Sequence, residues 1–280
     1  MSKGLYVINL RGEREPFSWQ KVYKSAKRAG ASSFLSKDIA DKIEREAYQG
    51  IKTSEIFRQI RKFLRGKEPQ AGLRFNLKKA MAMLGPTGFA FEKYIAEIFS
   101  EEEFKTKLNK IAAGRCCQHE IDFIAENNER IIYCECKYRN KGGSRIDLPL
   151  ILQNHARFLD IKNGAPLRDR NEARRLETLV ITNTKFTSEA IRYADCVGMG
   201  LLGWRHPRKQ GLEYFIETYK LYPITILPSF KKSLFSIFSE KKIMLAKDVL
   251  SLDMDKFAKE NNLVSRQLQS LVKEAKILLS

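Results

Sequence analysis

The sequence of 280 residues lacks any long apolar run, because no segment approaches the roughly 20 apolar residues that a membrane span requires. The opening stretch MSKGLYVINLRGERE also lacks the apolar core and small-residue cleavage site of a secretory signal. Repeats of solenoid period and low-complexity tracts are absent too. We therefore expect a globular protein of the cytoplasm with no membrane partner.

Cysteine is scarce, and its number is odd. The five cysteines are Cys116, Cys117, Cys134, Cys136 and Cys196. An odd count without an export signal argues against a disulfide framework and favours reduced thiols.

Acidic residues are few relative to basic ones, with 33 Asp and Glu against 51 Lys and Arg and a formal net charge of +18. A basic excess of this size indicates a polyanionic partner, either nucleic acid or an acidic membrane surface. Without a membrane segment, nucleic acid is favoured, and double-stranded DNA is the expected partner.

Changes in pattern along the chain predict three domains. Residues 1–85 combine a short strand and hairpin with helices, and residues 86–222 alternate helices with strand-like runs. Residues 223–280 contain short amphipathic helices. The fold class is therefore α/β, with a small mostly helical domain, a central mixed sheet flanked by helices, and a small helical C-terminal domain.

Polar residues mark the expected helix starts in the first domain. Ser18 is placed to cap a helix beginning at Trp19, because its hydroxyl can accept from a free amide of the first turn. Ser36 is expected to cap a second helix ending at Gly50, and Thr53 a third.

The stretch IIYCECKYRN, residues 131–140, carries the most informative pattern. In a strand, alternate side chains share a face, so Glu135 and Lys137 lie on one side and the cysteines between them on the other. The preceding run EIDFIAE can pair with this strand through a turn at residues 126–129. Such a hairpin brings Asp122 beside Glu135.

Two carboxylates and a lysine at one place on a sheet suit phosphodiester hydrolysis. Asp122 and Glu135 offer the hard oxygen ligands that Mg²⁺ prefers, and Lys137 can orient a water or stabilise developing negative charge. A strand whose charges merely face solvent is the plain alternative.

Zinc is a second alternative, and its candidate ligands are Cys116, Cys117, His119, Cys134 and Cys136. Structural zinc sites usually separate their cysteines by two to four residues, whereas these are adjacent or spaced Cys-x-Cys. Apart from the zinc interpretation, His119 is expected to support the site of Asp122 and Glu135 or to be satisfied by a local hydrogen bond.

The middle domain resembles the Mrr-type restriction endonucleases of the PD-(D/E)xK superfamily. The resemblance rests on GPTGFAFEKYIAEIF with Gly88, Phe91 and Glu92, then on HEIDFIA, ECK, TNTKFTSEAIRYA and GLLGW in the family's order. It implies a Mg²⁺-dependent DNA endonuclease that acts in restriction or defence. The catalytic residues implied are Glu92, Asp122, Glu135, Lys137 and Gln153, with Asp122 and Glu135 as metal ligands.

The first domain resembles the ATP-cone, a nucleotide-binding regulatory domain, through VINLRGEREPFSWQKVYKSAKRAG and YQGIKTSEIFRQI. The resemblance implies ATP or dATP as a regulatory ligand. The implied contacts are Val7, Arg11, Lys21, Lys24 and Thr53. Asn9 and Leu10 stand where the family has a basic pair, so a role in dimerisation or DNA docking stays open.

The C-terminal domain resembles helix-hairpin-helix domains, which grip DNA phosphates through backbone amides. Its expected hairpins, at residues 242–244 and 262–264, lack the usual glycine. Plain helical packing is therefore an equal alternative for this segment.

Together these features predict a nucleotide-regulated, Mg²⁺-dependent DNA endonuclease. Cutting both strands needs two active sites, so a homodimer or higher oligomer is expected. The alternative is a nucleotide-responsive DNA-binding regulator without cleavage activity. Repressors of that kind carry a zinc ribbon, whose Cys-x-x-Cys pairs this sequence lacks.

Overall fold

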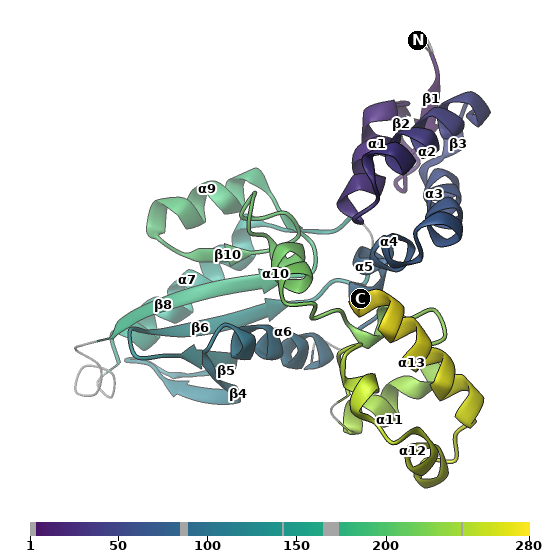
Figure 1. The fold of residues 1–280 in the computed structure, drawn as a ribbon. Coiled ribbons are helices and arrows are strands. Elements are labelled where there is room, and N and C mark those ends of the chain that lie inside the picture. Colours follow the sequence, from purple (N-terminus) through teal and green to yellow (C-terminus); the bar gives the residue numbers. More distant parts are fainter. Residues whose placement is uncertain (1–3, 85–88, 142, 165–173, 242) are drawn as a thin grey trace. The chain divides into compact units, whose positions relative to one another are not determined.

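The computed structural model describes the chain except residues 1–3, 85–88, 142, 165–173 and 242. Gly88 and Lys242 therefore lie outside the described residues. The chain forms two compact units (Figure 1), of which unit 1 comprises residues 1–81 and 222–280 and unit 2 residues 82–221. Each unit is described by itself.

Unit 1 begins with a small sheet. Strands β1 (Tyr6–Ile8) and β2 (Arg14–Pro16) form an antiparallel hairpin, and β3 (Ile51–Lys52) adds to β1 in parallel. The sheet order is β2-β1-β3.

Five helices accompany this sheet. They are α1 (Trp19–Arg28), α2 (Ser33–Glu46), α3 (Thr53–Lys67), α4 (Pro69–Arg74) and α5 (Leu77–Met81). The apolar stripes of α1, α2, α3 and α4 form one core with the sheet, in which Ile39, Ile43 and Leu64 are almost fully buried. Burial of these helix faces, rather than helix propensity, supplies most of their stability.

The helix starts correct two details of the sequence prediction. Ser18 caps α1 as expected, since its Oγ accepts from the amide of Lys21 at 3.2 Å. Ser32, not Ser36, caps α2, which ends at Glu46 rather than Gly50. The reason is that Leu35 belongs to the buried stripe of α2, so the helix must begin before it. Thr53 is the first residue of α3 and does not cap it.

The C-terminal part of unit 1 is made of short helices. They are η1 (Ile224–Ile226), η2 (Lys232–Leu234), α11 (Phe235–Glu240), η3 (Asp248–Ser251), α12 (Met254–Glu260) and α13 (Ser265–Leu279). Two side chains tie this part to the N-terminal part. Thr225 Oγ1 donates to the carbonyl of Ala80 at 2.8 Å, and Gln70 Nε2 donates to that of Leu278 at 3.3 Å.

Unit 2 is built on a five-stranded mixed sheet in the order β10-β8-β6-β5-β4. The strands are β4 (Lys105–Ala113), β5 (Gln118–Glu126), β6 (Arg130–Lys137), β8 (Arg175–Thr182) and β10 (Gly200–Leu202). Strands β4, β5 and β6 are antiparallel neighbours, whereas β6, β8 and β10 run parallel. The predicted α/β class with a mixed sheet is confirmed.

Helices cover both faces of this sheet (Figure 1). They are α6 (Phe89–Glu101), α7 (Leu148–Lys162), α9 (Ser188–Val197) and α10 (Leu212–Thr218). Phe99 of α6 packs edge-on against Phe123 at 5.5 Å between ring centroids, and Phe158 of α7 lies 6.3 Å from Tyr133. Because Phe123 pairs with Cys134, the neighbour of Tyr133, these two contacts lie on opposite faces.

A second, two-stranded parallel sheet joins β7 (Arg145–Ile146) to β9 (Lys185–Phe186). Thr187 caps α9, because its Oγ1 accepts from the amide of Ala190 at 3.3 Å. Among the helices of the described residues, none is long and apolar enough to cross a membrane.

Candidate active site

The β5–β6 hairpin brings the predicted aspartate and glutamate together. Phe123 pairs with Cys134 in the antiparallel register, so Asp122 and Glu135 come next on the two strands. The amide of Cys136 donates to Asp122 Oδ2 at 2.6 Å. The side chain of Asp122 is therefore held against β6.

Glu135 is a buried carboxylate, with 6% of its surface exposed. Burying a lone charge is costly, and here two cations offset the cost. Lys137 Nζ forms an ion pair with Glu135 Oε1, and Arg157 Nη1 lies 2.6 Å from Glu135 Oε2. Lys137 follows Glu135 on the same strand face, whereas Arg157 comes from α7.

Glu92 approaches the same place from α6. Burial first, and then the charges of Asp122 and Glu135, raise the pKa of Glu92 to about 7. Burial and the charge of Glu135 likewise raise the pKa of Asp122. The carboxylate cluster, defined as Glu92, Asp122 and Glu135, is thus a set of mutually repelling acids beside Lys137.

Gln153 was predicted for this site, and it is exposed on α7. Among the described residues, no hydrogen bond joins Gln153 to the carboxylate cluster. Arg157 lies one helical turn further along the same face and reaches Glu135 instead. A buried carboxylate such as Glu135 needs a cationic partner, and the sequence indicated that need. Residue spacing did not show that Arg157 is that partner.

The cysteines next to the cluster are buried, as strand alternation predicted. Cys134 is 1% exposed and Cys136 is 6% exposed, and both are free thiols. Burial raises the pKa of both thiols well above the ordinary value, so they stay protonated at neutral pH. Buried protonated thiols are poor metal ligands, because the thiolate is the form that binds.

His119 is satisfied by a hydrogen bond, but its partner is not local. Its Nε2 lies 2.7 Å from Oδ2 of Asp160, which is 41 residues away on α7. His119 therefore contacts α7 and not the carboxylate cluster.

Three of the five predicted nucleotide contacts line a single pocket of about 180 Å³ in unit 1. Val7, Lys21 and Thr53 lie in its wall, together with Glu15 and Phe17. Arg11 and Lys24 are exposed and do not line it.

The cation of this pocket already has a partner, because Lys21 Nζ lies 3.1 Å from Glu15 Oε2. Asn9, which stands where the ATP-cone family has a basic residue, donates to the other oxygen of Glu15 at 2.7 Å. A hydrogen bond from Asn9, and then the contact with Lys21, lower the pKa of Glu15. The pocket therefore carries a charged carboxylate beside its lysine.

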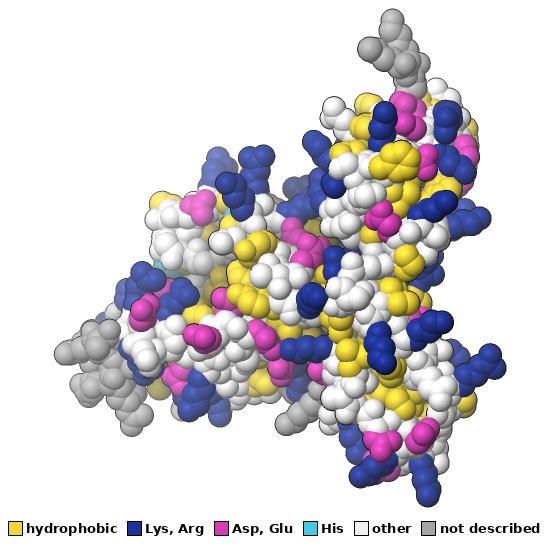
Figure 2. All heavy atoms as spheres, viewed as in Figure 1, with side chains coloured by type: hydrophobic (Ala, Val, Ile, Leu, Met, Phe, Trp, Pro, Cys, Tyr) yellow, Lys and Arg dark blue, Asp and Glu magenta, His cyan; other side chains and the backbone are white. Residues whose placement is uncertain are grey.

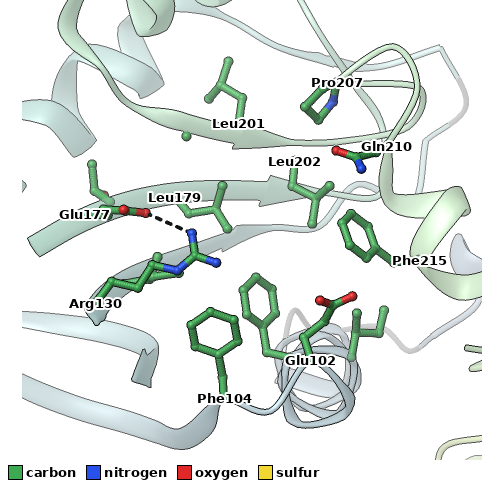
Figure 3. Close-up of a pocket in the computed structure, with 15 residues that line it drawn as sticks. Glu102, Phe104, Arg130, Glu177, Leu179, Leu201, Leu202, Pro207, Gln210 and Phe215 are labelled. Atoms are coloured by element: carbon green, nitrogen blue, oxygen red, sulfur yellow. Dashed lines mark ion pairs between the residues drawn. The ribbon is translucent and has the colours of Figure 1, made fainter. Parts of the chain in front are cut away.

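Unit 2 also contains an apolar cavity of about 310 Å³, separate from the carboxylates (Figure 3). Phe104, Leu202 and Phe215 contribute to its wall, and the ion pair of Arg130 with Glu177, 3.7 Å long, lies at one side. None of the residues that line it belongs to the carboxylate cluster.

The fold and the cluster together define an α/β protein with a buried carboxylate–lysine centre. Residues 222–279 match the family model described as AF1548-like, C-terminal. An uncharacterized protein of Archaeoglobus fulgidus is 35% identical over 183 residues, which span 65% of this chain and 98% of that protein. The chain belongs to this AF1548-like family.

Two solved structures were also compared. The crystal structure of AF1548, a protein of unknown function, matches at 32% identity and a TM-score of 0.57, covering 69% of this chain and all of that one. Protein VC1899 from Vibrio cholerae matches 72% of this chain and 55% of its own at 14% identity and a TM-score of 0.30, too low for a comparison of folds.

Proposed function

We propose that the chain is a Mg²⁺-dependent DNA endonuclease whose active site is the carboxylate cluster with Lys137. The observation that supports this most is the convergence of Asp122 and Glu135 on adjacent strands, with Glu92 arriving from a helix. Acids that raise one another's pKa are destabilised when all are ionised, and a divalent cation relieves that repulsion.

Each residue has a role in this proposal. Asp122 and Glu135 would hold Mg²⁺, whose chemistry is to polarise a phosphoryl oxygen and to lower the pKa of a bound water. Glu92, with a pKa of about 7, can accept or release a proton near neutral pH. Lys137 would orient the attacking water and stabilise negative charge at the phosphate.

The oxygen donors fit Mg²⁺ on one condition. Both oxygens of Glu135 already have cationic partners, Lys137 and Arg157. One of these side chains must move away from its oxygen for Glu135 to serve as a ligand. Arg157 is the better candidate to move, because it would then be free to contact the DNA backbone.

The finer domain layout is part of the same proposal. Unit 2 would be a restriction-endonuclease-like domain, and residues 1–85 an ATP-cone that binds ATP or dATP. The pocket shared by Val7, Lys21 and Thr53 supports the second assignment. Residues 223–280 would be a helix-hairpin-helix-like domain, and the assembly a homodimer that places two active sites on a duplex.

Double-stranded DNA is the proposed substrate because of the basic excess. Lys and Arg side chains are spread over both units on the face drawn in Figure 2, and the formal net charge is +18. Such a surface gains affinity for a duplex by releasing condensed counterions.

Plasmid cleavage with and without Mg²⁺ tests the proposal. Wild type is expected to linearise or nick the plasmid, and Asp122→Ala and Lys137→Ala are each expected to lose at least about 100-fold in rate. Asp195→Ala, which removes an exposed carboxylate from α9, is the matched control and should cleave normally. Equal cleavage by wild type and Asp122→Ala would refute the assignment.

A DNA-binding regulator without cleavage activity is the second candidate. The double pairing of Glu135 favours it, because a carboxylate with two cations at its oxygens is already satisfied without a metal. Under this alternative the wild type binds duplex DNA in a salt-dependent way but leaves it intact at every Mg²⁺ concentration.

A further inference from the structure

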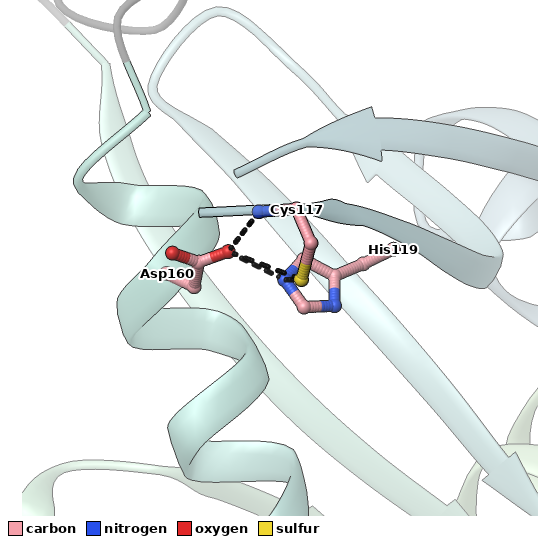
Figure 4. A group of neighbouring side chains, drawn as sticks. All are labelled: Cys117, His119 and Asp160. Carbon is pink, nitrogen blue, oxygen red and sulfur yellow. Dashed lines mark hydrogen bonds and ion pairs between the residues drawn. The ribbon is translucent and has the colours of Figure 1, made fainter. Parts of the chain in front are cut away.

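A second cluster of ligand-type side chains lies outside the carboxylate cluster (Figure 4). Cys117 and His119 come from the start of β5, and Asp160 comes from the last turns of α7. Among the described residues, these form the one group of three His, Cys, Asp or Glu side chains whose ligand atoms all lie within 4.8 Å of one another.

The three distances are close to those of a zinc centre. Cys117 Sγ lies 3.5 Å from His119 Nε2 and 3.8 Å from Asp160 Oδ2, and the last two atoms are 2.7 Å apart. Tetrahedral zinc, with bonds of about 2.3 Å to sulfur and about 2.0–2.2 Å to nitrogen and oxygen, separates such atoms by about 3.4–3.6 Å. The two distances from Cys117 Sγ are already close to these values. The third requires His119 Nε2 and Asp160 Oδ2 to move apart by less than about 1 Å.

The carboxylate is held in place before any ion arrives. The amides of Cys116 and Cys117 donate to Asp160 Oδ1 and Oδ2 at 2.9 and 3.3 Å. Hydrogen bonds of this kind orient a ligand carboxylate and support its charge.

Gly114 makes room for this arrangement. A Cβ at position 114 would lie 2.0 Å from Asp160 Oδ2, so the carboxylate fits beneath the loop only because this residue has no side chain. The close approach is independent of the ligand distances and indicates a site built around Asp160.

We propose that Cys117, His119 and Asp160 bind one zinc ion or a similar borderline divalent cation. Thiolate, imidazole and carboxylate are the ligand types that zinc takes, and they are unsuited as a set to Mg²⁺. Cys117 is exposed, so water completes the fourth position. The site shares no residue with the carboxylate cluster and does not depend on the proposed nuclease activity.

The bound ion ties two elements of unit 2 together. His119 precedes Asp122 by three residues on β5, about 10 Å along a strand, and Asp160 follows Arg157 by one turn of α7. The same strand and helix therefore carry both the ion and parts of the carboxylate cluster. The ion stabilises their packing.

Metal content of the full chain is the direct test. Protein treated with EDTA is given zinc or cobalt and dialysed, and bound metal is measured by mass spectrometry. Wild type and Cys196→Ser, which alters an exposed thiol on α9 outside the group, are expected to hold about one ion per chain. Cys117→Ser should hold under about a tenth of that, and His119→Ala should weaken zinc affinity more than about 100-fold.

Cobalt distinguishes a specific site from surface binding. A thiolate–cobalt charge-transfer band is expected in wild type and in Cys196→Ser, and its absence from Cys117→Ser identifies the ligand. Circular dichroism shows whether each variant is folded, and Cys117→Ser changes only an exposed sulfur to oxygen. Failure of the wild type to bind either metal would overturn the proposal. So would equal binding by Cys117→Ser, or loss of metal in Cys136→Ser alone.

Discussion

The carboxylate cluster of unit 2 and the pocket of unit 1 treat charge in opposite ways. In unit 2 the fold buries an acid, Glu135, and brings cations to it from β6 and from α7. In unit 1 the lysine of the pocket, Lys21, is exposed and lies beside a partly exposed carboxylate, Glu15. The side chain of Lys21 is 72% exposed, whereas that of Glu135 is 7% exposed.

This difference in burial determines how strongly each site favours a bound cation, proton or phosphate. A buried acid with raised-pKa neighbours stores repulsion that a cation or proton must relieve. An ion pair between solvated side chains contributes little to stability, so a phosphate can compete with Glu15 for Lys21. We therefore expect cation or proton binding at the carboxylate cluster to affect stability strongly. We expect phosphate binding in the pocket of unit 1 to be weak.

Among the variants considered, the removal of Arg157 is expected to change the free energy of unfolding most. Arg157→Leu leaves the buried carboxylate of Glu135 with Lys137 alone, and unfolding free energy should fall by about 3 kcal/mol. Urea denaturation followed by circular dichroism measures it. Arg192→Leu is the control, because its 3.8 Å pair with Glu189 is exposed and should contribute little to stability. Similar losses in the two variants would show that the burial of Glu135 does not matter.

Glu92 predicts the direction of a pH effect on stability. Its pKa rises to about 7 on folding, so between pH 4.5 and 7 the folded state binds more protons than the unfolded state. Stability from this group is present at low pH and is lost as pH rises toward 7. Because Glu92 is only half-buried, the change is expected to be about 1–2 kcal/mol rather than the full value for such a shift.

Glu92→Gln should therefore remove the loss of stability that Glu92 causes as the pH rises toward 7. The expected result is a variant more stable than wild type at pH 8 and no more stable at pH 4.5, measured as urea midpoints at the two values. Glu101→Gln, at the exposed end of α6, is the control. A wild type whose stability does not fall over this range contradicts the assigned environment of Glu92.

Lys21→Ala tests the pocket of unit 1. A charge-assisted hydrogen bond contributes about 1.5–3 kcal/mol, so its loss should weaken ATP or dATP binding by roughly ten-fold or more in calorimetry. Lys24→Ala should leave the affinity unchanged, because Lys24 does not line the pocket. If wild type binds neither nucleotide at millimolar concentration, the pocket is not a nucleotide sensor.

Ser36 should give the smallest effect. Its hydroxyl is fully buried within α2 and has no hydrogen-bond partner among the residues that the structure describes, which costs free energy. Ser36→Ala is expected to raise the unfolding free energy by up to about 1 kcal/mol, since alanine also favours the helix. Ser25→Ala, whose Oγ donates to the carbonyl of Lys21, is the control and should not stabilise.

The sequence was most informative where one residue fixes the place of the next. Strand alternation in β6 predicted that the cysteines lie opposite Glu135, and the short turn after β5 predicted a β5–β6 hairpin that brings Asp122 close to β6. Both depend only on strand period and turn length. The caps at Ser18 and Thr187 were predictable for the same reason, because a cap acts within three residues.

Contacts between distant segments were not predictable in this way. Arg157 and Asp160 both lie on α7, and which face of α7 meets the sheet depends on packing against Tyr133 through Phe158. Asp160, the partner of His119, is 41 residues away in the sequence, so no local pattern predicted this contact. Ser36 was misassigned because Ser32, Ser33 and Ser36 all stand near the start of α2, and only the buried stripe from Leu35 onward selects Ser32.

Unit 1 is formed by residues from both ends of the chain, and this affects how it folds during synthesis. Residues 82–221 all emerge before residues 222–280, so unit 2 is complete in sequence while unit 1 still lacks α13. Domains fold as units during synthesis, and the N-terminal part must therefore wait for the contacts that Gln70 and Ala80 make with the C-terminal segment. Closing a loop of that length costs little more than closing a short one, since the entropy grows only with the logarithm of length. The delay is thus one of timing on the ribosome, and the apolar surface that α13 later covers is exposed to chaperones for the whole of that interval.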